Sequence, residues 1–207
     1  MATTEPPVLY TCAGSRGLRA TWAAEEAGVA IDLQLLPFPP RFKAPDYLEV
    51  NPLGTVPMLV DGAAHMTESC AIAHYLATKG ADQSLVVAPD EVDYPAYLDF
   101  TYHADATITF PQTVYMRFAL FEKDKGWGEA GEAYAKWFWK RLVKLEQRLE
   151  TRDYLPVRGP LYRGRYLLRL RADSCGPGGL GRGRAAIAQG LPRPVDRTRG
   201  ISPGRGA

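Results

Sequence analysis

The chain has 207 residues, of which 46% are hydrophobic, as expected for a globular protein built as one compact unit or two small lobes. No stretch is long and apolar enough to span a membrane, and the N-terminus lacks the pattern of a secretory signal, so we expect a cytoplasmic protein. The net charge of +2 divides into −7 over residues 1–155 and +9 over residues 156–207, so the basic pI does not indicate a nucleic-acid partner for the first part.

The first 80 residues alternate short β-rich runs with helical patterns. The spacing predicts strands over 8–12, 29–36, 56–60 and 63–66, and helices over 16–27, 43–50 and 67–80. In the first helix Leu18, Trp22 and Ala23 share an apolar face, and Gly28 closes it. Asp61-Gly62 is a strong hairpin signal between the last two strands. This order of elements predicts a thioredoxin-like α/β lobe over residues 1–80.

A second, all-helical region follows a linker over residues 81–93. Two long helices are predicted over 94–121 and 130–150. In the second helix the residues that share one face are Tyr134, Trp137, Phe138, Arg141, Leu142, Leu145 and Leu149. This is the pattern of a helix bundle, and it predicts a partial all-α C-terminal domain over residues 94–155.

The composition changes abruptly after Leu155. Residues 156–207 contain 11 Gly, 11 Arg and 6 Pro and no Lys, Glu, Phe or Trp. Such a segment cannot bury a bundle core, so the all-α domain is truncated or replaced after about residue 155. We expect the apolar face around Trp137, Phe138, Leu142 and Leu145 to be partly uncovered, with poor solubility as the consequence.

The three cysteines, Cys12, Cys70 and Cys175, are an odd number without metal-like spacing. This argues against a disulfide framework and a zinc site, and it fits a reducing compartment.

Three motifs within the first lobe point to one family. Residues 51–57 read N-P-L-G-T-V-P, residues 67–72 read T-E-S-C-A-I, and residues 15–19 read S-R-G-L-R. Their order and spacing resemble those of glutathione S-transferases, and the S-R-x-x-R turn resembles serine-type bacterial members. The resemblance implies glutathione as co-substrate with no further cofactor, a small hydrophobic electrophile, detoxification chemistry and a homodimer if the C-terminus is intact.

The resemblance also implies the glutathione-binding residues. Ser69, at a helix N-terminus, would receive the γ-glutamyl carboxylate, and Glu68 would pair with the amine. A cis bond between Val56 and Pro57 would turn the Val56 main chain toward the peptide backbone of glutathione. The simpler interpretations are that residues 67–69 only cap a helix, and that Pro57 is a trans edge-strand proline.

Ser15 is the first candidate for catalysis. A hydroxyl donor beside the positive end of a helix favours the thiolate of glutathione over the thiol, whereas serine is too weak a base to remove the proton itself. Cys12 forms a C-x-x-S pattern with Ser15 and would instead give mixed-disulfide chemistry. Tyr10 ranks third, and helix capping is the structural alternative for Ser15.

The electrophile site is expected on the first long helix. Its candidates by position are Tyr102, His103, Thr107 and Pro111. The leading function is therefore glutathione transfer by thiolate attack. The alternatives are a non-catalytic binding or regulatory protein of the same fold and an inactive product, and the same lobe also supports isomerase, dehalogenase and peroxidase chemistry.

The tail itself suggests a frameshift near Leu155. Allowed codons for Pro156 to Ala172, read one base out of frame, can encode L-C-G-D-R-F-T-A-A-D-I-S-C-G-Y-A-L. This contains the F-T-x-A-D-I helix start that the family carries at this place. The alternative is a disordered Arg/Gly tail that binds RNA or an acidic partner, although it lacks interleaved aromatic residues.

Overall fold

The computed structural model describes residues 5–81 and 83–150, without the side chains of Ser84 and residues 144–150. The predicted tail at 156–207 and the frameshift after Leu155 lie outside the described residues.

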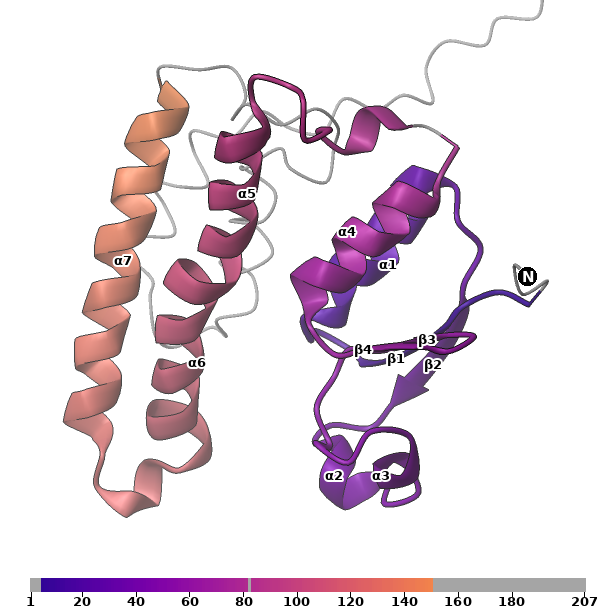
Figure 1. Ribbon diagram of the computed structural model, residues 1–207. Helices are drawn as coiled ribbons and strands as arrows, with labels where there is room; N and C mark the ends of the chain where they lie inside the picture. Colours follow the sequence, from indigo (N-terminus) through magenta and orange to yellow (C-terminus); the bar gives the residue numbers. More distant parts are fainter. Residues whose placement is uncertain (1–4, 82, 151–207) are drawn as a thin grey trace, which may run out of the picture. The chain divides into compact units, whose positions relative to one another are not determined.

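A four-stranded mixed sheet forms the centre of the N-terminal lobe (Figure 1). Its strands are β1 (Val8–Cys12), β2 (Asp32–Leu36), β3 (Met58–Asp61) and β4 (Ala64–Met66), in the order β2-β1-β3-β4. β1 is parallel to β2 and antiparallel to β3, and β3 and β4 form a hairpin. Gly62 has a φ of 57°, which explains the glycine in the hairpin turn. The predicted thioredoxin-like lobe is confirmed.

Two helices, α1 (Gly17–Ala27) and α4 (Ser69–Lys79), pack side by side on this sheet (Figure 1). Near their N-termini Arg19 donates a hydrogen bond to Ser69. At their C-terminal ends a Cβ on Gly80 would lie 2.5 Å from the Ala27 carbonyl oxygen. The two helices therefore run in the same direction, with both N-termini at one end. The short helices α2 (Pro40–Lys43) and α3 (Tyr47–Val50) lie in the connection between β2 and β3.

The buried face of α1 differs from the predicted one. Leu18 is exposed, whereas the residues that face inward are Gly17, Arg19, Ala20, Ala23, Ala24 and Ala27. The close approach of Gly80 to Ala27 gives the reason toward the C-terminal end of α1, where only small side chains fit between α1 and α4. At the N-terminal end Arg19 is buried instead by its hydrogen bond to Ser69. The prediction from hydrophobic periodicity was wrong for Leu18 because packing distance, rather than hydropathy, selects the inner face.

The helical region shares one hydrophobic core with the N-terminal lobe. Leu85 is the last residue of the single turn η1 (Gln83–Leu85), and Leu85 and Val87 are buried in one cluster with Tyr97 and Phe100. The helix then continues without a break from Tyr94 to Phe121, as predicted, through α5 (Tyr94–Tyr102), a π-helical segment (His103–Thr109), α6 (Phe110–Met116) and a second π-helical segment (Arg117–Phe121). The turn η4 (Lys123–Lys125) leads into α7 (Gly128–Glu150), which packs against α6 and starts two residues before the predicted boundary.

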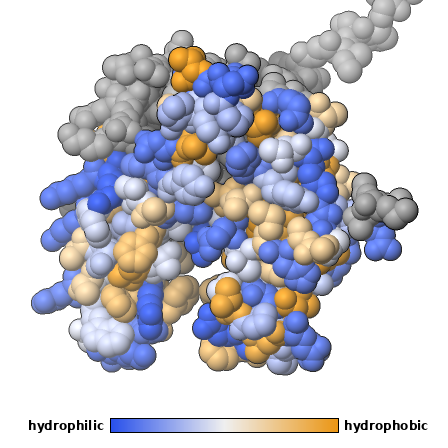
Figure 2. Space-filling view, in the orientation of Figure 1, coloured by the Kyte–Doolittle hydropathy of each residue, from blue (hydrophilic) through white to orange (hydrophobic). Residues whose placement is uncertain are grey.

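The apolar face of α7 is covered more completely than the sequence suggested. Phe138 and Leu142 are buried, and only Trp137 is exposed, at 42%. The expectation of an uncovered face is therefore wrong for Phe138 and Leu142, and the side chain of Leu145 lies outside the described part. On the N-terminal lobe, large apolar side chains around α2 and α3 reach the surface (Figure 2); they are Phe42, Leu48 and Leu53. Within residues 5–81 and 83–150, no helix has the length and hydropathy to cross a membrane.

Gly17 provides a test of the packing beneath α1. A Cβ at this position would lie 1.8 Å from the Thr11 Oγ1 and 2.6 Å from the Thr11 Cβ. We expect Gly17→Ala to lower the free energy of unfolding by about 1–3 kcal/mol, as overpacking does in a closed core. Urea unfolding followed by circular dichroism measures this change.

Gly128→Ala is the matched control, because Gly128 also starts a helix and a Cβ there would meet nothing within 4 Å. Its free energy of unfolding should stay the same or rise slightly. Equal destabilisation by the two substitutions would contradict the packing described for Gly17.

Candidate functional site

Two hydroxyl groups lie at the two helix N-termini that meet at one end of the lobe. Ser15 precedes the first residue of α1 by two positions, and Ser69 is the first residue of α4. Free backbone N–H groups and the positive end of the helix dipole favour anions at such positions. Because α1 and α4 run in the same direction, these two effects add at this end of the lobe.

Ser15 is half-buried and hydrogen-bonded on two sides. Its Oγ lies 2.9 Å from the Thr11 Oγ1, and it accepts a hydrogen bond of 3.2 Å from the Gly17 N–H. The second contact satisfies one orphan donor of α1, so the capping interpretation holds in part. This contact does not use the Ser15 proton, because an acceptor oxygen keeps its own hydrogen.

The two alternatives to Ser15 have other surroundings. Cys12 is 3% exposed, its Sγ faces the Pro37 carbonyl oxygen at 3.7 Å, and burial raises the pKa of its thiol. A buried thiol with a raised pKa is a weak nucleophile. The Tyr10 ring is half-buried and packs on Tyr47, with 5.5 Å between the ring centroids. This geometry favours Ser15 over both, and the catalytic assignment stays a prediction.

The segment 51–57 forms the loop that enters β3. The Val56–Pro57 bond is cis, as the resemblance implied, and Pro57 is buried. The pairing of β1 with β3 ends at Tyr10 and Met58. Val56, two residues before Met58, therefore lies outside the paired part of the sheet. The buried Asn51 holds the loop, since its Nδ2 donates to the Thr55 carbonyl oxygen at 2.8 Å and its Oδ1 accepts from the Leu53 N–H.

Ser69 is almost fully buried, and its Oγ accepts a hydrogen bond of 3.0 Å from Arg19. Glu68, by contrast, is exposed, and as the N-cap residue of α4 it makes no side-chain capping hydrogen bond. The simpler interpretation, that this segment only caps α4, is therefore not supported for Glu68. At this helix start the Glu68 carboxylate is therefore exposed, and the neighbouring Ser69 hydroxyl is buried.

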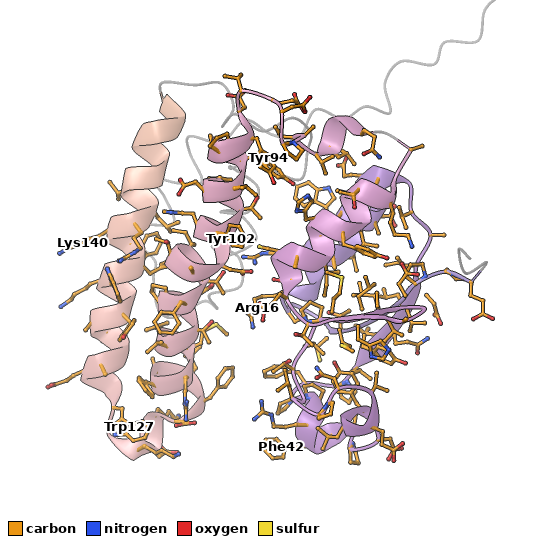
Figure 3. The ribbon with its side chains drawn as sticks, viewed as in Figure 1. Arg16, Phe42, Tyr94, Tyr102, Trp127 and Lys140 are labelled. Atoms are coloured by element: carbon orange, nitrogen blue, oxygen red, sulfur yellow. The ribbon has the colours of Figure 1, made fainter. Side chains whose placement is uncertain are left out.

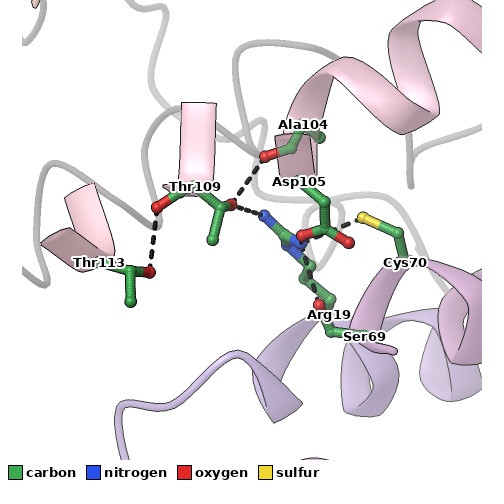
Figure 4. Close-up of polar contacts among 7 residues, drawn as sticks. All are labelled: Arg19, Ser69, Cys70, Ala104, Asp105, Thr109 and Thr113. Carbon is green, nitrogen blue, oxygen red and sulfur yellow. Dashed lines mark hydrogen bonds and ion pairs between the residues drawn. The ribbon is translucent and has the colours of Figure 1, made fainter. Parts of the chain in front are cut away.

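Arg19 connects this helix start with the helical region (Figure 4). Its side chain is only 6% exposed, and its guanidinium donates to Ser69, Cys70, Asp105 and Thr109. The last two residues lie on the π-helical segment, one turn apart, and Thr109 also donates to the Ala104 carbonyl oxygen. Arg19 is part of the S-R-x-x-R turn, but nothing in that local pattern connects it with Asp105, 86 positions later.

The charge of Arg19 sets the ionisation of Asp105. Burial by itself would raise the pKa of this carboxyl, but the charge and hydrogen bond of Arg19 outweigh that effect and hold the pKa below its usual value. Cys70 also hydrogen-bonds to Asp105, and the exposed Arg16 at the start of α1 adds a smaller effect in the same direction (Figure 3). The pair is therefore ionised at neutral pH.

The four residues predicted for the electrophile site differ in their exposure. Tyr102, at the end of α5, is 69% exposed (Figure 3), and His103 and Thr107 are half-buried. Pro111 is fully buried, so in this structure it is a core residue and offers no surface to a ligand. In the part of the chain that the structure describes, no group of three or more His, Cys, Asp or Glu residues is arranged to hold a metal ion.

The Arg19–Asp105 pair predicts a pH-dependent contribution to stability. A carboxyl with a depressed pKa in the folded state stabilises above its unfolded pKa, and this contribution disappears as the pH falls toward the folded value. We expect Asp105→Asn to be less stable than the unsubstituted chain at pH 7, with the difference narrowing below about pH 4. Chemical unfolding at a series of pH values measures both. Asp90→Asn, which changes an exposed carboxyl in the connection before α5, is the control. A difference that stays constant with pH would contradict the assigned pairing.

Comparisons with known proteins support the fold of the N-terminal lobe. The family model described as the N-terminal domain of glutathione S-transferase matches residues 15–79. The glutathione transferase URE2P6 from Phanerochaete chrysosporium, solved with oxidized glutathione, has a TM-score of 0.71 at 24% identity, over 90% of this chain and 89% of that chain. This similarity concerns the fold.

Two curated relatives match at higher identity over shorter segments. A probable elongation factor 1-gamma 2 from Arabidopsis thaliana is 40% identical over 83 residues, which is 38% of this chain and 19% of the relative. The glutathione S-transferase hmp2 from Hypomyces subiculosus is 35% identical over 92 residues, which is 41% of each chain. This chain thus spans less than half the length of either relative. Residues 15–79 are thus similar to the N-terminal domain of glutathione S-transferases.

Proposed function

We propose that the chain binds glutathione at the N-termini of α1 and α4 and activates its thiol for attack on small electrophiles. The observation that supports this most directly is the meeting of two helix N-termini, each with a serine hydroxyl, at one end of the lobe. Glutathione carries carboxylates at its ends and a thiol that must become a thiolate, so it suits a site that favours anions at two points.

Ser69 and Glu68 would bind the γ-glutamyl end. Because Ser69 accepts its hydrogen bond from Arg19, its own proton is available for the carboxylate. The exposed Glu68 would pair with the amine next to that carboxylate. The Val56 main chain, beyond the end of the sheet register, would pair with the peptide backbone of glutathione, in the manner of an added strand.

Ser15 would act on the sulfur. A free thiol has a pKa of about 8.5, so only a small fraction is ionised at neutral pH. Hydrogen-bond donation from Ser15, together with the positive end of α1, would lower that pKa, and the proton would leave to solvent. The thiolate then forms a carbon–sulfur bond, and the leaving group, for example chloride, departs with the electron pair of the broken bond.

A non-catalytic binding role is the second candidate. The relative with 40% identity is named for translation elongation rather than for glutathione transfer. The fold therefore does not choose the activity, which depends on the groups around Ser15. The two candidates differ in what happens to bound glutathione, because only the enzyme has to lower the pKa of the thiol.

Substitution of Ser15 tests the catalytic proposal. We expect Ser15→Ala to lower kcat/KM about 10²- to 10³-fold, the usual effect of losing one donor to a developing anion. The affinity for glutathione should change little. Conjugation of glutathione to a chloride activated by nitro groups gives the rate, and calorimetry gives the affinity.

Cys12→Ala is the matched control, since this buried thiol lies three residues before Ser15 in the chain. It should keep the rate. Loss of activity in Cys12→Ala with full activity in Ser15→Ala would contradict the assignment to Ser15. Binding of glutathione by the unsubstituted chain without any conjugation would favour the non-catalytic candidate.

Ser69→Ala tests the binding proposal separately. Removal of this hydroxyl should weaken glutathione binding by about 1–2 kcal/mol, or roughly five- to thirtyfold in Kd, because a charged group loses a hydrogen bond. Because Ser69 lies at the γ-glutamyl end, kcat at saturating glutathione should fall much less than in Ser15→Ala. Thr78→Ala, an exposed hydroxyl on the same helix, is the control. A variant of Ser69 with unchanged affinity would remove this residue from the site.

A further inference from the structure

Thr11 is a buried hydroxyl directly behind the proposed catalytic serine. It lies on β1, is 5% exposed, and its Oγ1 is 2.9 Å from the Ser15 Oγ. Its other contact is with the Cys12 carbonyl oxygen at 3.5 Å. Nothing in the local sequence pattern predicts the contact with Ser15.

The direction of the Thr11–Ser15 hydrogen bond follows from counting protons. A hydroxyl has one proton and two acceptor positions, and the Ser15 Oγ already accepts from the Gly17 N–H at 3.2 Å. If Ser15 donates to Thr11, the one acceptor left for the Thr11 proton among the described residues is the Cys12 carbonyl oxygen, at a distance beyond the usual range for O–H···O bonds. If Thr11 donates to Ser15, Thr11 has a good partner and Ser15 keeps its own proton for a third group. Burial makes the second arrangement the favoured one, because an unsatisfied buried hydroxyl is costly.

The packing of α1 leaves room for this hydroxyl. A side chain at position 17 would overlap the Thr11 Oγ1, with 1.8 Å between the atoms. Glycine at this position therefore allows the hydroxyl to lie beneath the first turn of α1, within reach of Ser15. Two positions six residues apart, Thr11 and Gly17, are both needed for the contact.

We propose that Thr11 is a positioning residue that holds the Ser15 hydroxyl as a hydrogen-bond donor to the sulfur of glutathione. The inference rests on the proposed function of Ser15. With Thr11 donating behind it and the Gly17 N–H donating beside it, Ser15 has both acceptor positions filled. Its proton is then directed outward. Thr11 itself neither takes up nor releases a proton during the reaction.

The test compares three chains: the unsubstituted one, Thr11→Val, which removes the hydroxyl at nearly constant shape, and Thr11→Ser, which retains it. The readout is the pKa of the thiol of bound glutathione, titrated by the ultraviolet absorbance of the thiolate. We expect Thr11→Val to raise this pKa by about one unit, which corresponds to about a tenfold loss of kcat/KM below the pKa. The loss should disappear at high pH, and Thr11→Ser should restore the original titration.

A double variant separates positioning from stability. If Thr11 acts through Ser15, Thr11→Val should leave the thiol pKa unchanged in the Ser15→Ala background. A valine variant with the original thiol pKa would overturn the inference, as would equal shifts in Thr11→Val and Thr11→Ser. If Thr11→Val does not fold, Thr11→Ala is measured in its place with the same criteria.

Failure of this inference is distinguishable from failure of the proposed function. If Ser15→Ala raises the thiol pKa and Thr11→Val does not, only the role of Thr11 is wrong. If Ser15→Ala itself leaves the thiol pKa unchanged, both the thiol-activating function of Ser15 and the inference built on it are overturned.

Discussion

Arg19 brings a full positive charge into a part of the molecule where its side chain is only 6% exposed, and that charge has to be matched there. The match comes from the start of α4 and from the π-helical segment of the helical region, through Ser69, Cys70, Asp105 and Thr109 (Figure 4). Loss of either side would leave a buried charge with too few partners. The packing of α1 against α4 and the long helix therefore depends on the Arg19 side chain. The orientation of the Ser69 hydroxyl depends on it as well.

The two serines of the candidate site have similar hydrogen-bond surroundings. Each accepts hydrogen bonds from groups inside the protein: Ser69 from Arg19, and Ser15 from the Gly17 N–H with Thr11 behind it. A hydroxyl that is occupied as an acceptor keeps its proton for a ligand. With the positive ends of two helices at the same place, such donors favour an anion without needing a strong base. The chemistry of the site thus depends on the groups behind the serines as much as on the serines themselves.

Much of the fold could be predicted from local signals. Asp61-Gly62 predicted the hairpin because a left-handed turn suits glycine, and the motif at 51–57 correctly implied the cis bond before Pro57. The long helices were predicted from their periodicity. The inner face of α1 was not, because Leu18 is exposed while the cation Arg19 is buried, against the usual preference of both residues. Hydropathy cannot predict a buried arginine whose partners come from distant segments.

The sequence by itself determined the order of strands and helices, the family resemblance and the two candidate serines, since these depend on residues close together in the chain. Only the tertiary structure decided that Cys12 is buried and that the Thr11 hydroxyl lies 2.9 Å from the Ser15 Oγ. It alone joined Arg19 to Asp105, 86 positions away. The physical reason is that the burial, pKa and hydrogen-bond direction of a side chain depend on neighbours that folding brings together. Local sequence patterns do not predict which residues those neighbours are.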